Sequence, residues 1–149
     1  NSLCRPSPRS LPLLVTGIGS SGTHTIQRIF AMNKVLLGHE SVGQHGSASW
    51  PYAVDVTRAT SPIECFPPPH HTFNHVVHVV RCPRDVVSAM HNGLWQSAAN
   101  CALRYVRDTL KLEFGTGRLD SLQFDMLAWL KWNEHVESYA EARYRIDEF

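Results

Sequence analysis

Short apolar runs alternate with helix-like segments along the N-terminal half of the chain. Residues 11–16 form an apolar run that ends at a glycine, a pattern typical of a buried parallel strand. Residues 23–32 carry apolar side chains at helical spacing and predict a helix. Two further apolar runs, residues 34–38 and the valine-rich residues 73–81, are predicted to be the second and third strands.

The C-terminal half continues with helices and one more strand. Pro83 suits the first turn of a helix that follows the third strand, and residues 94–112 predict another helix. Asp120 and the glutamine three residues later are spaced as a capping box, which predicts a third helix through Val136. Residues 144–149 are expected to form the last strand. Strands that alternate with helices predict an open, mostly parallel α/β sheet flanked by helices.

The remaining segments set the domain organisation. Residues 41–71 have no periodic pattern and contain three consecutive prolines, so they are predicted to form a long loop of the kind that often serves function. Residues 1–10 are expected to be a flexible lead-in, and residues 11–149 a single domain.

Composition narrows the classes of partner. The chain has 14 Lys and Arg residues against 13 Asp and Glu, a formal net charge of +1, so nothing favours bulk electrostatic binding to nucleic acid. No apolar run approaches the roughly 18–20 residues that a membrane span needs, and a membrane anchor is expected only outside this segment. The four cysteines show no CxxC pairing and leave the compartment open. Any bound anion must therefore be held by a shaped local site.

A loop rich in glycine and hydroxyl groups separates the first strand from the first helix. In a parallel sheet, ligands bind beyond the carboxyl ends of the strands, where this loop is predicted to lie. Its backbone N–H groups and the N-terminus of the helix can receive an anion without any lysine. The predicted anion-binding residues are Gly19, Ser20, Ser21, Gly22, Thr23, His24 and Thr25.

Two general motifs overlap this loop. Gly17 and Gly22 fit a Walker A motif, but Thr23 stands where that motif has lysine, which disfavours hydrolysis of ATP or GTP with Mg²⁺. The same stretch also fits GxGxxG, with Glu40 about where an acid would bind a ribose. An NAD(P)-binding Rossmann oxidoreductase is therefore one alternative. A strand-to-helix turn closed by a serine cap is the simplest alternative.

The loop also resembles a known family. The stretch VTGIGSSGTHT resembles the phosphosulfate loop of the P-loop sulfotransferases, which transfer sulfate from 3′-phosphoadenosine 5′-phosphosulfate (PAPS). The stretch HVVHVVRCPRDVVSAM resembles the second signature of that family, a strand that ends in Arg, then x-Pro, then a helix with a serine. The resemblance implies that Arg81 and Ser88 hold the 3′-phosphate of PAPS. A guanidinium fork suits that task because it can bind phosphate with two hydrogen bonds.

Three more stretches extend the resemblance over most of residues 12–149. GHESVGQHGSASWPYAV resembles a segment that carries a catalytic glutamate in one branch of the family, which implies that Glu40 is the base, with His39 as the adjacent candidate. WLKWNEHV and YRIDEF resemble a later helix and strand. The family runs on past that strand, so we expect the C-terminal part of the domain to be missing here.

The resemblance sets the expected function and also its alternatives. It implies a sulfotransferase that moves a sulfuryl group from PAPS to a hydroxyl or amine of a carbohydrate or protein acceptor. No metal is expected to take part. The expected compartment is the Golgi lumen if the source is eukaryotic and otherwise the cytoplasm. Two positions differ from the family pattern. Ser20 replaces the usual Lys or Arg, and Ala89 stands where the family more often has its serine. A non-catalytic nucleotide-binding module therefore stays open as a further alternative.

Two other groups of residues have a structural interpretation. His71, His75, His78 and Cys82 would share one face of a helix and could then bind zinc. The valines between them favour a strand, on which His75 and His78 point to opposite faces. Trp129 and Trp132 are predicted to pack in the core, and residues 50–52 to shape the acceptor cleft.

Overall fold

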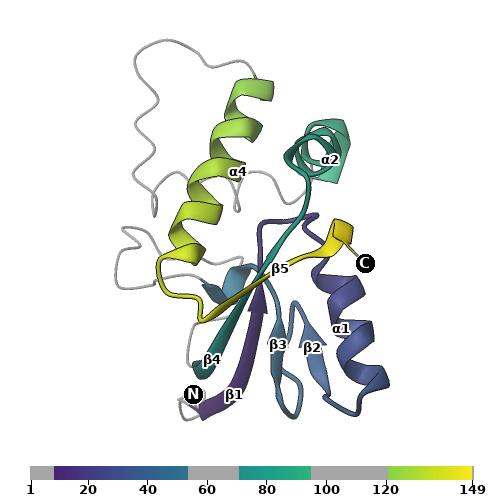
Figure 1. Cartoon of the computed structure of the whole chain (residues 1–149), viewed down its shortest axis with the longest axis vertical. Coiled ribbons are helices and arrows are strands. Elements are labelled where there is room, and N and C mark those ends of the chain that lie inside the picture. Colours follow the sequence, from purple (N-terminus) through teal and green to yellow (C-terminus); the bar gives the residue numbers. More distant parts are fainter. Residues whose placement is uncertain (1–8, 54–70, 95–120, 149) are drawn as a thin grey trace, which may run out of the picture.

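The computed structural model describes residues 9–53, 71–94 and 121–148, and it is an α/β fold in which a five-stranded parallel sheet is flanked by helices (Figure 1). This confirms the predicted fold class at the level of a parallel α/β sheet. The elements in chain order are β1 (Arg9–Thr16), α1 (Thr23–Met32), β2 (Leu37–His39), β3 (Gly46–Ala48), η1 (Pro51–Ala53), β4 (His71–Val80), α2 (Pro83–Ala89), η3 (Met90–Leu94), α4 (Ser121–Glu137), β5 (Ala142–Arg145) and η4 (Ile146–Glu148).

The strand order β2-β3-β1-β4-β5 places β1 at the centre of the sheet. From β1 the chain runs through α1 toward β2 on one side, whereas from β4 it runs through α2 and α4 toward β5 on the other side. The carboxyl ends of β1 and β4 therefore meet where the chain changes direction. In open α/β sheets this position is where ligands bind.

Each face of the sheet has its own apolar cluster. Leu14 packs with residues of α2 and α4, whereas Val15 packs with Ile26 of α1, because neighbouring side chains on a strand point to opposite faces. Trp132 of α4 is 0% exposed and lies in the first cluster. The predicted core position of Trp132 is confirmed, and Trp129 packs against the same cluster while only partly buried.

The second strand begins later than the sequence indicated, and an additional strand follows it. Lys34 has a φ of 62° and Val35 N donates to Phe30 O, so the predicted start of the strand is instead the turn that ends α1. Within the segment predicted to be a loop, β3 (Gly46–Ala48) pairs in parallel with both β1 and β2. Its sequence, Gly-Ser-Ala, has neither the alternation nor the branched side chains that mark a strand.

Other predicted bounds hold to within a few residues. α1 and α2 begin at the predicted residues, and α2 continues into the π-helical turn η3. β1 starts at Arg9, inside the predicted lead-in, and the strand predicted over residues 144–149 lies earlier, at Ala142–Arg145, before the turn η4. The predicted helix over residues 94–112 and the Asp120 cap fall almost wholly outside the described residues.

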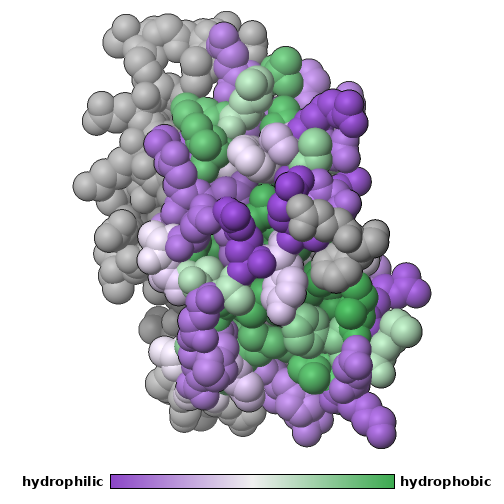
Figure 2. Space-filling view, in the orientation of Figure 1, coloured by the Kyte–Doolittle hydropathy of each residue, from purple (hydrophilic) through white to green (hydrophobic). Residues whose placement is uncertain are grey.

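The surface is mixed in character. Figure 2 shows apolar surface among hydrophilic residues on the side of the molecule where α1 lies, and exposed apolar side chains there include Ile29 and Met32 of α1 and Leu36 in the turn that follows. Among the described helices, none combines the length and apolar character that crossing a bilayer requires.

Candidate anion-binding and base site

The loop between β1 and α1 is held close to the end of β4. A Cβ atom on Gly17 would lie 2.2 Å from Val79 O, so only glycine allows β1 and β4 to approach this closely. Ser21 N donates to Ile18 O at 2.9 Å and closes a tight turn. Ser20 adopts a φ of 70°, which is uncommon for a residue with a side chain and costs backbone energy. The loop is therefore built in a single strained conformation.

The N-terminus of α1 faces out of this loop without a side-chain cap. Gly22 is the N-cap residue, with a φ of 99°, and no side chain of the described residues caps the helix. The tight turn of the structural alternative is therefore present, but its serine cap is not. The first N–H groups of a helix have no partners within the helix, so an uncapped end carries donors and a partial positive charge that suit an anion.

The predicted hydroxyl and histidine donors of the loop do not all point the same way. Ser21 is 1% exposed, and its Oγ is buried against Gly17 with no hydrogen-bond partner among the described residues, so this hydroxyl faces the interior. The Thr23 Oγ1 lies 3.4 Å from His39 Nε2. His24 and Thr25 are exposed on the first turn of α1. Fewer of these side chains are thus free to donate out of the loop than the sequence indicated.

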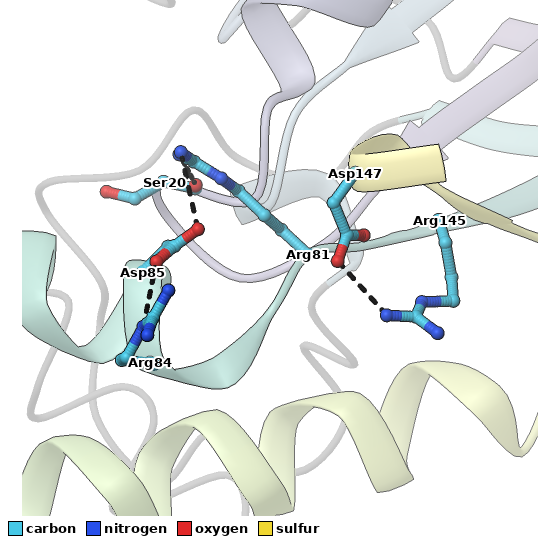
Figure 3. Close-up of polar contacts among 6 residues, drawn as sticks. All are labelled: Ser20, Arg81, Arg84, Asp85, Arg145 and Asp147. Carbon is cyan, nitrogen blue, oxygen red and sulfur yellow. Dashed lines mark hydrogen bonds and ion pairs between the residues drawn. The ribbon is translucent and has the colours of Figure 1, made fainter. Parts of the chain in front are cut away.

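Arg81 extends from the end of β4 to the loop, as Figure 3 shows. Its Nη1 lies 3.5 Å from Ser20 O, at the long end of hydrogen-bond geometry, and its Nη2 lies 4.0 Å from Asp85 Oδ2. The Arg81 side chain stays 40% exposed. The structure therefore brings together the two predicted anion-binding features, the loop and Arg81, with the guanidinium still open to solvent.

Ser88 lies one turn further along α2 than Asp85. Ser88 and Ala89, three and four residues after Asp85, are both its neighbours on the helix surface, and Asp85 is the residue that pairs with Arg81. Ser88 is exposed and its Oγ accepts a hydrogen bond from Asn92 Nδ2 at 3.3 Å. Ala89, by contrast, is partly buried. Both positions are thus on the side of α2 that carries Asp85, and Ser88 is the more exposed of the two.

The turn after β5 also reaches the loop, which the sequence did not indicate. A Cβ atom on Gly22 would lie 2.4 Å from Ile146 Cδ1, so Ile146 packs directly on the N-cap of α1. Arg145 Nη2 and Asp147 Oδ2 form an ion pair at 3.0 Å, and Figure 3 shows this pair on the other side of Arg81 from Asp85. Only the pairing of β5 with β4 places these residues here, and no local sequence pattern carries that information.

His39 and Glu40 come together beyond the end of β2. Glu40 leaves the strand with a φ of 49°, and this turn brings its Oε1 to 3.9 Å from His39 Nε2. On a continuous strand the two side chains would point to opposite faces. The ring of His24 lies 5.0 Å from the ring of His39, so the first turn of α1 adjoins the same cluster. Both predicted base residues therefore face one place beside the loop.

The Glu40 carboxylate is held from β3. Ser49 Oγ donates to Glu40 Oε2 at 2.8 Å, and the backbone N–H of Trp50 donates to the same carboxylate. Burial raises the pKa of Glu40, and these two hydrogen bonds partly oppose the rise. Burial, together with the nearby His24, lowers the pKa of His39. A carboxylate with a raised pKa beside a neutral histidine is an arrangement suited to accepting a proton.

The histidines of β4 lie on different faces, as the strand assignment predicted. His75 Nδ1 contacts Glu141 Oε2 at 2.9 Å on the exposed side, whereas His78 is 1% exposed and its Nε2 lies 2.8 Å from Asn133 Oδ1. Burial lowers the pKa of His78. Within the described ranges, no three His, Cys, Asp or Glu side chains are grouped so that they could hold a metal ion.

A cavity of about 410 Å³ lies between η1, β4 and the C-terminal end of α4. Its apolar floor includes Val76, and its walls include the rings of Tyr52, Phe73 and Tyr139. No Asp, Glu, Lys or Arg is among the described residues that line it. Burial and the charge of Glu40 both raise the pKa of Tyr52, so this wall of the cavity is within electrostatic range of the base.

Comparison of the chain with protein-family models, with curated proteins and with solved structures finds no match.

Proposed function

We propose that this chain is a PAPS-dependent sulfotransferase domain with the P-loop sulfotransferase fold. The observation that carries the proposal is the position of Arg81. Its guanidinium lies 3.5 Å from the carbonyl oxygen of Ser20, in the loop that precedes an uncapped helix N-terminus. A nucleotide with phosphate at two positions needs two anion-binding groups close together, and these are the backbone donors of the loop and the fork of Arg81.

The chemistry assigned to the site is an in-line transfer. The acceptor oxygen attacks the sulfur of PAPS, Glu40 takes the acceptor proton, and the bond from sulfur to the 5′-phosphate oxygen breaks with its electron pair on that oxygen. Backbone N–H groups of the loop and the N-terminus of α1 stabilise the charge that develops on the leaving phosphate. Arg81 approaches the loop at Ser20, the position that lacks the usual cation, and adds positive charge there.

The acceptor is proposed to approach along the cavity beside Tyr52. Tyr52 lines this cavity and also interacts electrostatically with Glu40. The turn η1, which carries Tyr52, follows directly after Trp50, whose N–H donates to the Glu40 carboxylate. Because its described lining carries no Asp, Glu, Lys or Arg, it suits an uncharged part of a carbohydrate or protein acceptor.

The strand order speaks against the dinucleotide alternative. In the Rossmann order 3-2-1-4-5-6 the second strand lies next to the first, which brings its terminal acid to the ribose. Here β3 lies between β1 and β2. Glu40 is also engaged by Ser49, at 2.8 Å, rather than directed freely at a ribose.

Calorimetry with 3′-phosphoadenosine 5′-phosphate (PAP), and with NAD as the competing ligand, tests the proposal. We expect PAP to bind, NAD not to bind, and Arg81→Ala to raise the Kd for PAP by about ten- to a hundred-fold, since hydrogen bonds to charged groups contribute roughly 1.5–3 kcal/mol. Arg84→Ala is the matched control, because that side chain is 88% exposed and its removal costs the same formal charge.

The outcomes separate the alternatives. An unchanged Kd for PAP in Arg81→Ala, or tighter binding of NAD than of PAP, would contradict the proposal. If PAP binds through Arg81 but no labelled sulfate passes from PAPS to hydroxyl acceptors, the chain is a nucleotide-binding module and not a transferase.

A further inference from the structure

Ser49 is fixed in the sheet more firmly than the carboxylate it contacts. It follows β3 directly, is 0% exposed, and its backbone N donates to Val15 O of the central strand at 2.9 Å. Its hydroxyl donates to Glu40 Oε2 at 2.8 Å. Glu40, by contrast, lies on a turn with a φ of 49° and keeps 34% of its side chain exposed. The buried serine is therefore suited to set the orientation of the more exposed carboxylate.

We propose that Ser49 is the positioning residue of the base: its buried hydroxyl holds Oε2 of Glu40, so that Oε1 is the oxygen that receives the acceptor proton. Oε1 lies 3.9 Å from His39 Nε2, on the side of the loop and α1. The assignment of Glu40 as base rests on the proposed function, whereas the contact between Ser49 and Glu40 does not.

The hydroxyl has a second consequence for proton transfer. Burial favours the protonated carboxyl of Glu40, and the hydrogen bonds from Ser49 and from the N–H of Trp50 favour the charged form, lowering its pKa. Among the described residues, the carboxylate has His39 of β2 at 3.9 Å and Tyr52 of η1 within electrostatic range, and His24 of α1 lies against the ring of His39. Of these four groups, Glu40 is the one that Ser49 contacts, so removing the hydroxyl should act on Glu40 first.

Ser47 provides a matched control two residues earlier. Ser47 lies in β3 and is likewise 0% exposed, and its Oγ donates to Ser41 O at 2.7 Å. Ser47→Ala therefore removes a buried hydroxyl and a hydrogen bond of the same kind without removing a contact to Glu40. Ser49→Thr keeps the hydroxyl. Glu40→Gln assigns the carboxyl signal in NMR spectra of protein labelled with ¹³C at glutamate carboxyl groups.

The test titrates the Glu40 carboxyl by NMR and measures kcat/KM against pH in the same variants. We expect Ser49→Ala to raise the pKa of Glu40 by about one unit. We also expect the acid limb of kcat/KM to move by the same amount, so that activity falls about ten-fold at low pH and recovers at high pH. Ser49→Thr should restore the wild-type titration, and Ser47→Ala should leave it unchanged.

An unchanged pKa of Glu40 in Ser49→Ala, or an equal shift in Ser47→Ala, would overturn the positioning role. The NMR titration needs neither nucleotide nor turnover. If no sulfate transfer is found, the titration still decides whether Ser49 controls Glu40, and the missing activity counts against the sulfotransferase alone.

Discussion

Replacing Gly17 with alanine tests whether the close approach of β1 and β4 builds the anion site. The added Cβ would lie 2.2 Å from Val79 O and 2.4 Å from Ser21 Oγ, whereas real Cβ contacts stay beyond 3.0 Å. The serine hydroxyl can rotate away, but the carbonyl belongs to a strand paired on both sides, so backbone must shift by about 0.8 Å. Overpacking of this kind costs about 1–3 kcal/mol of folding free energy. The same shift would change the position of the loop relative to Arg81, which follows Val79 by two residues.

We expect Gly17→Ala to lower the midpoint of urea unfolding, measured by tryptophan fluorescence. We also expect it to raise the Kd for PAP in calorimetry by about ten-fold or more, since loss of one charge-assisted hydrogen bond has this magnitude. Gly19→Ala is the control for stability, because Gly19 is in the same loop and its φ is outside the left-handed region. It should change the unfolding free energy by less than about 0.5 kcal/mol. Wild-type stability together with wild-type PAP affinity in Gly17→Ala would refute the link between the two strands and the site.

Two further predictions concern the core that supports the site. Trp132→Ala should lower the free energy of unfolding by about 3–5 kcal/mol, because this 0% exposed ring fills the cluster between α4 and the sheet. Urea unfolding followed by circular dichroism measures the change. A decrease of less than about 1 kcal/mol would contradict that packing. Burial lowers the pKa of His78 below its ordinary value of 6.5, so the unfolded chain takes up the proton first as the pH falls. As the pH falls below 6.5, the free energy of unfolding therefore decreases by up to about 1.4 kcal/mol per pH unit. In His78→Gln, whose side chain can still hydrogen-bond to Asn133, the free energy of unfolding should change less between pH 6.5 and 5.5 than in the wild type. The same pH dependence in both proteins would count against a buried neutral histidine.

Strands with strong side-chain patterns could be predicted from the sequence, and the strand without one could not. The apolar run of β1 and the valines of β4 identify two central strands, since branched side chains suit a pleated surface. β3 has only Gly-Ser-Ala, and its glycine is required because a Cβ on Gly46 would collide with the backbone of Leu13. Because β3 packs closely against β1, only small residues fit there, and small residues do not form the side-chain pattern that predicts a strand.

The meeting of the loop with Arg81 was predictable for a general reason. Both follow strands at their carboxyl ends, and in a parallel sheet those ends lie on one edge. The arrival of Ile146 at Gly22 was not predictable, because it depends on the pairing of β5 with β4 over a long sequence separation. Local sequence thus predicted that the loop and Arg81 lie close together, whereas the contact of Ile146 with Gly22 depends on tertiary pairing.

His39 and Glu40, the two predicted base residues, show how a local backbone change alters a functional prediction. Alternation along a strand would direct either His39 or Glu40 to the site, but not both. The left-handed turn at Glu40 removes that restriction, and the hydroxyl of Ser49 and the N–H of Trp50 then fix its carboxylate. A residue with a side chain keeps such a φ only where its surroundings stabilise it, and such positions gather at functional sites. Of the three described residues with a side chain and such a φ, Lys34 lies in the turn that ends α1, whereas Ser20 and Glu40 belong to the proposed site.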